Sequence, residues 1–259
     1  MNRTYIRRPG LWGLAVGVVL CISSGALCQE SIADLTAAAK KNNVEAQYKL
    51  GRAYELGLGT PISIKDAIEW YRRAARANHA PSQLALGSIY AAGAGVKQDW
   101  REAARQFQAA ADAGLPEAQC RLAFCLLRGL GVKQNPTEAA RYYEKAAEKG
   151  VVEAQMRLGE MYYNGEGVEK DYRLAFKWLL LAAERGLPEA QYRIGGFYLL
   201  GQGDVKRDLV EAHKWFILAL PLGRDDPQKL PEKMATLYRM TPEQIQESFK
   251  KAKEFKPSA

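Results

Sequence analysis

The sequence is poor in the residues that carry most enzymatic and metal chemistry. Among its 259 residues only two are His, His79 and His213, and four are Cys. It contains no zinc-protease helix, no phosphate-binding loop and no Gly-x-Ser-x-Gly element. We therefore predict no catalytic residues, no metal site and no cofactor, and we interpret both His residues as parts of the structure.

The cysteines do not form a disulfide framework. Two of them, Cys21 and Cys28, lie in the first 28 residues, which leaves Cys120 and Cys125 for the rest of the chain. Five residues apart on a helix, the latter two side chains point in different directions and lie too far apart for a disulfide. We expect both to be buried free thiols.

Long apolar runs are also scarce. The run Leu11–Ile22 is too short to span a bilayer comfortably, and it follows three Arg residues. The residues Ala26-Leu27-Cys28 then resemble a cleavage site, so residues 1–28 are predicted to be a secretory signal peptide. The chain is then exported to the periplasm or the cell exterior and keeps no integral membrane segment after signal removal. The alternative is an uncleaved membrane anchor.

The excess of basic over acidic residues is modest. The chain has 37 Lys and Arg against 29 Asp and Glu, and loss of the three Arg of the signal segment leaves 34 against 29, or +5. Such a charge is compatible with an acidic partner or an anionic surface. It does not argue for a nucleic-acid partner.

What the sequence does contain is a repeat of 36 residues. A Gln recurs at Gln47, Gln83, Gln119, Gln155 and Gln191. A Gly-x-Gly recurs at Gly57 and Gly59, Gly93 and Gly95, Gly129 and Gly131, Gly165 and Gly167, and Gly201 and Gly203. We predict that these ten glycines are a structural signature of the repeat. Self-similarity at such a period is typical of a solenoid, which usually offers a surface for partners and has no catalytic cleft.

Each repeat carries the signals of two helices. One column holds preferred N-cap residues: Ser63, Asp99, Asn135, Asp171 and Asp208. Another holds residues that tolerate a left-handed C-terminal position: Asn78, Gly114, Gly150, Gly186 and Gly223. These signals predict a helix A from about Ala46 to Leu56 and a helix B over about residues 64–77, repeated along the chain. The Gly-x-Gly forms the turn between them. Asp204 is an insertion, so the fifth repeat is shifted by one residue from there on.

The repeat blocks resemble a known family. Leu158-Gly159-x-x-Tyr162-x-x-Gly165-x-Gly167-Val168-x-x-Asp171 and Ala175-x-x-Trp178-x-x-x-Ala182-Ala183 are similar to Sel1-like repeats, relatives of the tetratricopeptide repeat. The resemblance covers five copies, at 44–79, 80–115, 116–151, 152–187 and 188–223. It implies an all-α fold, a right-handed α-solenoid of helix–turn–helix repeats. Ala123 departs from the family's Gly within helix A.

Both ends of the array are expected to be capped. Residues 29–43 contain a segment that aligns with a helix B alone, which predicts an N-terminal capping helix. Residues 224–259 are expected to form C-terminal capping helices after a loop near Asp225-Asp226-Pro227. Within them, Thr241-Pro242-Glu243-Gln244 is close to a capping box at the start of a helix.

The resemblance also implies that the A helices line a concave surface. One exposed column of these helices is basic, with Glu four residues earlier in most repeats, so a self-paired solvated surface is one interpretation. The other is an interface, because Arg52, Phe124 and Arg128, with Tyr163 beside them, combine aromatic and Arg residues. The predicted partner-binding residues are Lys49, Arg52, Arg121, Phe124, Arg128, Arg157, Tyr163 and Arg193.

Two functions from different classes follow. The first is a monomeric, non-catalytic adaptor of the bacterial envelope that binds a protein or peptide on this surface. The alternative is a cell-wall enzyme or glycan binder, because some Sel1-like proteins have been described as β-lactamases. Ser248 and Lys251 fit the pattern S-x-x-K, but the accompanying S-D-N and K-T-G motifs are absent and the Ser is expected on a terminal helix.

Overall fold

The computed structural model describes residues 31–220, 233 and 235–258. Across these residues, the regular structure is helical, and no strand is present. The helices are α1 (Ile32–Lys40), α2 (Val44–Leu56), α3 (Ile64–Arg76), α4 (Ala80–Ala92), α5 (Trp100–Asp112), α6 (Pro116–Arg128), α7 (Pro136–Glu148), α8 (Val152–Asn164), α9 (Tyr172–Glu184), α10 (Pro188–Leu200), α11 (Leu209–Leu218) and α13 (Pro242–Glu254). The predicted signal peptide, Gly223 and the loop at 225–227 lie outside the described residues.

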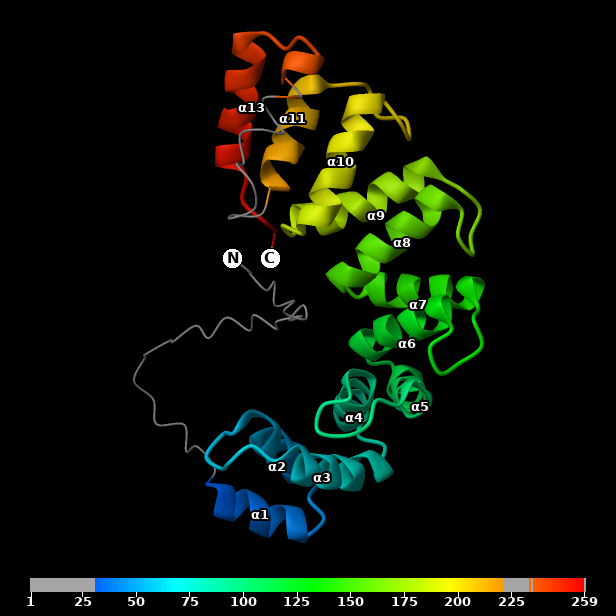
Figure 1. The fold of residues 1–259 in the computed structure, drawn as a ribbon, viewed down its shortest axis with the longest axis vertical. Coiled ribbons are helices and arrows are strands. Elements are labelled where there is room, and N and C mark those ends of the chain that lie inside the picture. Colours follow the sequence, from blue (N-terminus) through cyan, green and yellow to red (C-terminus); the bar gives the residue numbers. More distant parts are fainter. Residues whose placement is uncertain (1–30, 221–232, 234, 259) are drawn as a thin grey trace, which may run out of the picture.

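The helices stack in a curved row, with α1 at one end and α13 at the other (Figure 1). The even-numbered helices α2 to α10 are the A helices, and each packs against the B helix that follows it. In Figure 1, α4 lies toward the inside of the curve and α5 toward the outside. This arrangement confirms the predicted all-α solenoid of helix–turn–helix repeats. None of the described helices is both long enough and apolar enough to cross a membrane.

The predicted cap residues start and end these helices. The side chains of all five predicted N-cap residues accept hydrogen bonds from backbone N–H groups of the first turn of their B helices. Each A helix α2 to α10 ends at the first Gly of its Gly-x-Gly, which has a left-handed conformation, as at Gly57 with φ of 72°. The boundaries of the helices are therefore fixed by local chemistry that recurs with the repeat.

The two helices of one repeat interlock through a glycine. A Cβ atom added to Gly87 of α4 would lie 2.5 Å from the ring of Phe107 of α5. Gly51 and Gly159 make equally close approaches, to Tyr71 and Leu179. The glycine of helix A thus leaves the room that a large side chain of helix B fills, and such interdigitation produces the dense packing of a core.

The second Gly of each Gly-x-Gly faces the first residue of the preceding B helix or, in the first repeat, of the capping helix α1. In the last three repeats the loop presses on the main chain there. A Cβ atom at Gly131 would collide with the carbonyl oxygen of Trp100, and one at Gly203 would lie 2.5 Å from that of Tyr172. The first Gly of the motif therefore ends helix A, and the second brings the loop against the previous repeat.

Gly59 and Gly95 differ from this pattern. An added Cβ atom at these positions would meet a side chain instead of a carbonyl, at 3.2 Å from Ile32 and at 2.9 Å from Ile64. The contacts of the second Gly with the preceding repeat thus differ along the array. Each of the ten still has a positive φ, including Gly59 at 72° and Gly95 at 66°. At these two positions the turn conformation requires Gly more than the approach to the neighbouring repeat does.

The recurring Gln forms a second link between repeats. Its side-chain amide donates to the carbonyl of an Ala at the end of the preceding B helix. Gln47 donates to Ala39 at 3.1 Å, and Gln191 donates to Ala183 at the same distance. The other three Gln residues make the same contact at 3.2–3.5 Å: Gln83, Gln119 and Gln155. The Gln column is therefore structural.

Candidate functional site

The eight residues predicted to bind a partner all lie on A helices. They come from α2, α6, α8 and α10, and the exposed ones are Lys49, Arg52, Arg121, Arg128 and Arg193. The half-buried ones are Phe124, Arg157 and Tyr163. The helical repeat thus brings most of the predicted charges to solvent, while the two aromatic rings are partly withdrawn.

Two arginines of this surface pair across repeats, and a third pairs within its own helix. Arg121 lies 3.7 Å from Glu153 of the next repeat, and Glu160 lies 3.0 Å from Arg157 and 3.2 Å from Arg193. The expected pairing of these arginines with the Glu four residues earlier in their own helices is therefore wrong. Because the A helices lie side by side, carboxylates of a neighbouring repeat or of the next turn compete with that Glu. Exposed pairs of this kind add little stability, about 0–1 kcal/mol each.

The two aromatic residues of the predicted site serve the core as well. Phe124 packs against the main hydrophobic cluster. The ring of Tyr163 meets those of Tyr172 and Phe197 edge-on, with centroids 5.2 and 5.7 Å apart. The Arg193 guanidinium lies 5.9 Å from the centre of the Tyr163 ring. Tyr163 is therefore a ring held by its neighbours with a cation beside it.

A hollow opens beside Arg52 at the N-terminal end of the array. It has a volume of about 730 Å³, and its wall includes Ile32, Leu35, Lys49, Arg52 and Leu58. Leu58 is 55% exposed, in the middle of the first Gly-x-Gly. The residues aligned with Leu58 are polar in the last two repeats. This difference within the sequence could have indicated an apolar contact next to Arg52. The hollow therefore combines cationic and apolar groups.

The charges of Arg52 and Arg128 are not neutralised by a carboxylate of the described residues. Arg52 lies 6.0 Å from the centre of the Tyr48 ring. Within residues 31–220 and the described part of the C-terminal region, neither Arg52 nor Arg128 forms an ion pair with a carboxylate. Both remain available for an acidic group of another molecule.

The two thiols are buried as expected and unreactive by environment. Cys120 and Cys125 are free and buried, and burial raises the pKa of Cys120 to about 12 and that of Cys125 to about 11. Because the thiolate is the reactive form, we predict that neither thiol of the folded protein reacts with Ellman's reagent at pH 8. Both should react once the protein is unfolded in guanidinium. Rapid reaction of either thiol in the folded state would contradict this environment.

Ser248 of the S-x-x-K pattern is engaged in a structural contact. It is fully buried, its hydroxyl donates to the Ile245 carbonyl at 2.7 Å, and its oxygen lies 2.7 Å from Nδ1 of His213. The two side chains are within hydrogen-bonding distance of each other. His213 thus fastens α13 to α11. No sequence spacing signals this contact, because the two residues lie in separate helices.

Lys251, the Lys of the S-x-x-K pattern, is also engaged in ion pairs. Lys251 lies 2.9 Å from Glu211 and 3.4 Å from Glu247. Burial raises the pKa of Glu211, but hydrogen bonds from Lys214 and Lys251 outweigh it and lower the pKa below its ordinary value. An ionised Glu211 thus holds Lys251 in place. Among the described residues, no three His, Cys, Asp or Glu side chains form a group able to hold a metal ion.

Comparisons with known proteins agree with the geometry. The family model of the Sel1 repeat matches residues 44–79, 80–115, 116–151, 152–187 and 188–220. The structure of a protective antigen present in uropathogenic Escherichia coli strains, which displays an SLR fold, is 30% identical with a TM-score of 0.74. That match covers 86% of this chain and 48% of the antigen, so the chain spans about half the length of that protein.

A second structural neighbour is matched over most of its length. The Sel1 repeat protein from Oxalobacter formigenes is 30% identical, with a TM-score of 0.64, over 75% of this chain and 78% of that one. No curated protein matches this chain. On the evidence of five matched repeats and these two structures, the chain belongs to the Sel1 repeat family.

Proposed function

We propose that this protein is an exported, non-catalytic adaptor that holds a protein or peptide partner on the exposed side of its A helices. Sel1 repeat proteins generally mediate protein–protein interactions. The export part of the proposal rests on the sequence of residues 1–28. The binding part rests on the surface built by α2, α6, α8 and α10.

The hollow beside Arg52 is the observation that carries the proposal. It offers apolar contact from Ile32, Leu35 and Leu58 next to the guanidinium of Arg52. Protein interfaces combine such apolar area with Arg residues. Arg128 of α6 is a second arginine that forms no ion pair with a carboxylate of the described residues. A peptide with an apolar side chain and an acidic one matches these two features.

The contacts of Ser248 and Lys251 support the non-catalytic part. A nucleophilic Ser needs an accessible oxygen and a base that takes its proton. Ser248 is buried and donates its proton to a main-chain carbonyl, and Lys251 is paired with Glu211. These contacts do not favour the cell-wall enzyme as a second candidate.

The proposal is tested by capture with charge-reversed variants. The chain from Gln29 onward is used as bait in envelope extract. It is compared with the variant Arg52→Glu/Arg128→Glu and with the matched control variant Arg101→Glu/Arg141→Glu. The control reverses two exposed arginines of B helices. We expect a partner whose Kd for the first variant rises about tenfold or more, since each lost charged contact costs about 1.5–3 kcal/mol. An equal loss in the control would contradict a helix-A site.

A further inference from the structure

One column of the B helices is aromatic in four of the five repeats. Its aromatic members are Trp70, Tyr142, Trp178 and Trp215. Trp178 and Trp215 are buried, and Tyr142 packs against the core. The second repeat has Gln106 at this position instead. A pocket between α3 and α5 is lined by this smaller side chain.

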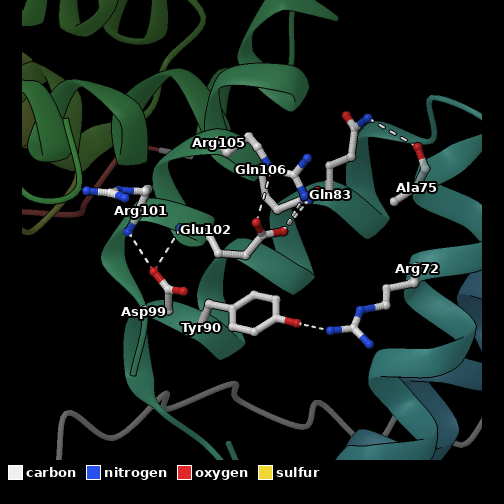
Figure 2. Close-up of polar contacts among 9 residues, drawn as sticks. All are labelled: Arg72, Ala75, Gln83, Tyr90, Asp99, Arg101, Glu102, Arg105 and Gln106. Carbon is white, nitrogen blue, oxygen red and sulfur yellow. Dashed lines mark hydrogen bonds and ion pairs between the residues drawn. The ribbon is translucent and has the colours of Figure 1, made fainter. Parts of the chain in front are cut away.

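The pocket has a volume of about 390 Å³, and α4 lies beneath it. Its lining includes Arg72, Arg76, Gln83, Glu102, Arg105 and Gln106. Figure 2 shows the side chains of five of these residues, drawn from the two B helices and from α4. The pocket thus holds three guanidinium groups and one carboxylate.

The carboxylate of Glu102 already accepts hydrogen bonds from residues of its own helix. Glu102 accepts two hydrogen bonds from Arg105, at 2.7 and 3.0 Å, and one from Gln106 at 2.9 Å (Figure 2). Partial burial raises the pKa of Glu102, but these hydrogen bonds outweigh it and leave the pKa lowered. Glu102 therefore stays ionised at neutral pH and neutralises Arg105. The charges left over in the pocket are those of Arg72 and Arg76.

These two arginines have no acidic partner in the described part of the chain. Arg72 is nevertheless held in position, because its guanidinium donates to the hydroxyl of Tyr90 and lies 6.0 Å from the centre of that ring. A cation that is fixed in advance loses less entropy when it binds an anion. Arg76 lies one turn further along α3, on the same wall of the pocket.

A buried Gln lies beneath the pocket. Gln83 is 5% exposed, and its Oε1 has no hydrogen-bond partner, while its Nε2 donates to Ala75 at 3.4 Å. Gln119 and Gln155 have the same unpaired oxygen, but Tyr142 and Trp178 occupy the positions equivalent to Gln106 in those repeats. In the second repeat the Gln residue lies beneath a pocket whose lining also includes Arg72 and Arg76.

We propose that the pocket between α3 and α5 binds an acidic side chain of a protein partner, with its carboxylate on Arg72 and Arg76. The planar guanidinium group matches a carboxylate with two parallel hydrogen bonds. The site is separate from the hollow beside Arg52 and does not depend on it.

The test measures fluorescence anisotropy of a labelled hexapeptide with two central glutamates and of its glutamine counterpart. The protein is the full chain cleaved before Gln29, as wild type, Arg72→Gln/Arg76→Gln, Gln106→Trp, and the charge-matched control Arg101→Gln/Arg141→Gln. We expect the glutamate peptide to bind the first two variants about tenfold more weakly and the control within about twofold. Gln106→Trp should keep the thermal midpoint of the wild type, because Trp stands at this position in three repeats.

The following results would overturn the proposal. The first is unchanged binding to Gln106→Trp with its fold intact. The second is an equal loss in Arg101→Gln/Arg141→Gln, which would indicate attraction by net charge alone. The third is equal binding of the glutamine peptide, or displacement by inorganic phosphate at lower concentration than by acetate, which would show that the pocket does not select a carboxylate.

Discussion

Gly131→Ala should destabilise the protein by about 3 kcal/mol or more, because two costs add at this position. Gly131 has a φ of 72°, which an L-residue with a side chain adopts only with strain. The new methyl group would also collide with the carbonyl oxygen of Trp100, so the loop must move away from the preceding repeat. Urea unfolding followed by circular dichroism at about 222 nm, where helices absorb, measures the loss.

Gly114→Ala is the matched control for this effect. Gly114 also has a positive φ, of 85°, but an added Cβ atom would meet nothing within 4 Å. This substitution should cost only the conformational strain, about 1–2 kcal/mol. Equal losses in the two variants would show that the close approach of the loop to the preceding repeat has no energetic weight.

Phe107→Ala should destabilise the protein by about 3–5 kcal/mol, because it empties the room between α4 and α5. The side chain is 2% exposed and lies against Gly87. Thermal and urea unfolding measure the loss. Gln106→Ala is the neighbouring control, and since Gln106 lines the pocket between α3 and α5 it should change the stability by less than about 0.5 kcal/mol.

A double substitution tests the interlock itself. Gly87→Ala alone should destabilise, because its methyl group meets the Phe107 ring and overpacking costs about 1–3 kcal/mol. In the Phe107→Ala background the ring is gone, so the same substitution should stabilise the helix by up to about 1 kcal/mol. Gly196→Ala, whose Cβ atom would meet nothing within 4 Å, should stabilise in either background. Additive effects of Gly87→Ala and Phe107→Ala would contradict the interlock.

The helices were predictable from the sequence because their signals are local. Ser63 and Asp99 cap their helices through bonds to residues two or three positions away, and Gly57 ends its helix through its own left-handed conformation. Each signal recurs every 36 residues. One repeat that departs from the pattern, such as the repeat with Ala123, therefore did not obscure the fold. The C-terminal capping box at Thr241 was recognisable for the same reason.

The details of the candidate site were not predictable in the same way, because they depend on contacts between repeats. Arg121 pairs with Glu153 instead of the Glu in its own first turn, and Glu160 pairs with two arginines at once. Helical spacing gives the possible pairs within one helix, whereas the distance between neighbouring A helices decides which pair forms. The contact between His213 and Ser248 likewise exists only because α13 packs on α11.

The exposure of an aromatic side chain was also not predictable from the sequence alone. Phe124 lies in a column that faces away from the core of its own repeat, yet it packs against the main cluster. A residue at the edge of one repeat can be covered by the next, and helical periodicity within a single helix does not record this. The charges of Arg52 and Arg128 are therefore better supported as binding groups than the ring of Phe124.

Site-specific photo-cross-linking tests the adaptor account most directly. A benzophenone amino acid replaces Arg52, Arg128, Arg101 or Arg141 one at a time in the full chain, and cells that produce it are irradiated before their proteins are separated. The account predicts that one partner is linked from positions 52 and 128, and that it is absent from positions 101 and 141 on the B helices. Linkage from 101 and 141 with none from 52 and 128 would contradict it.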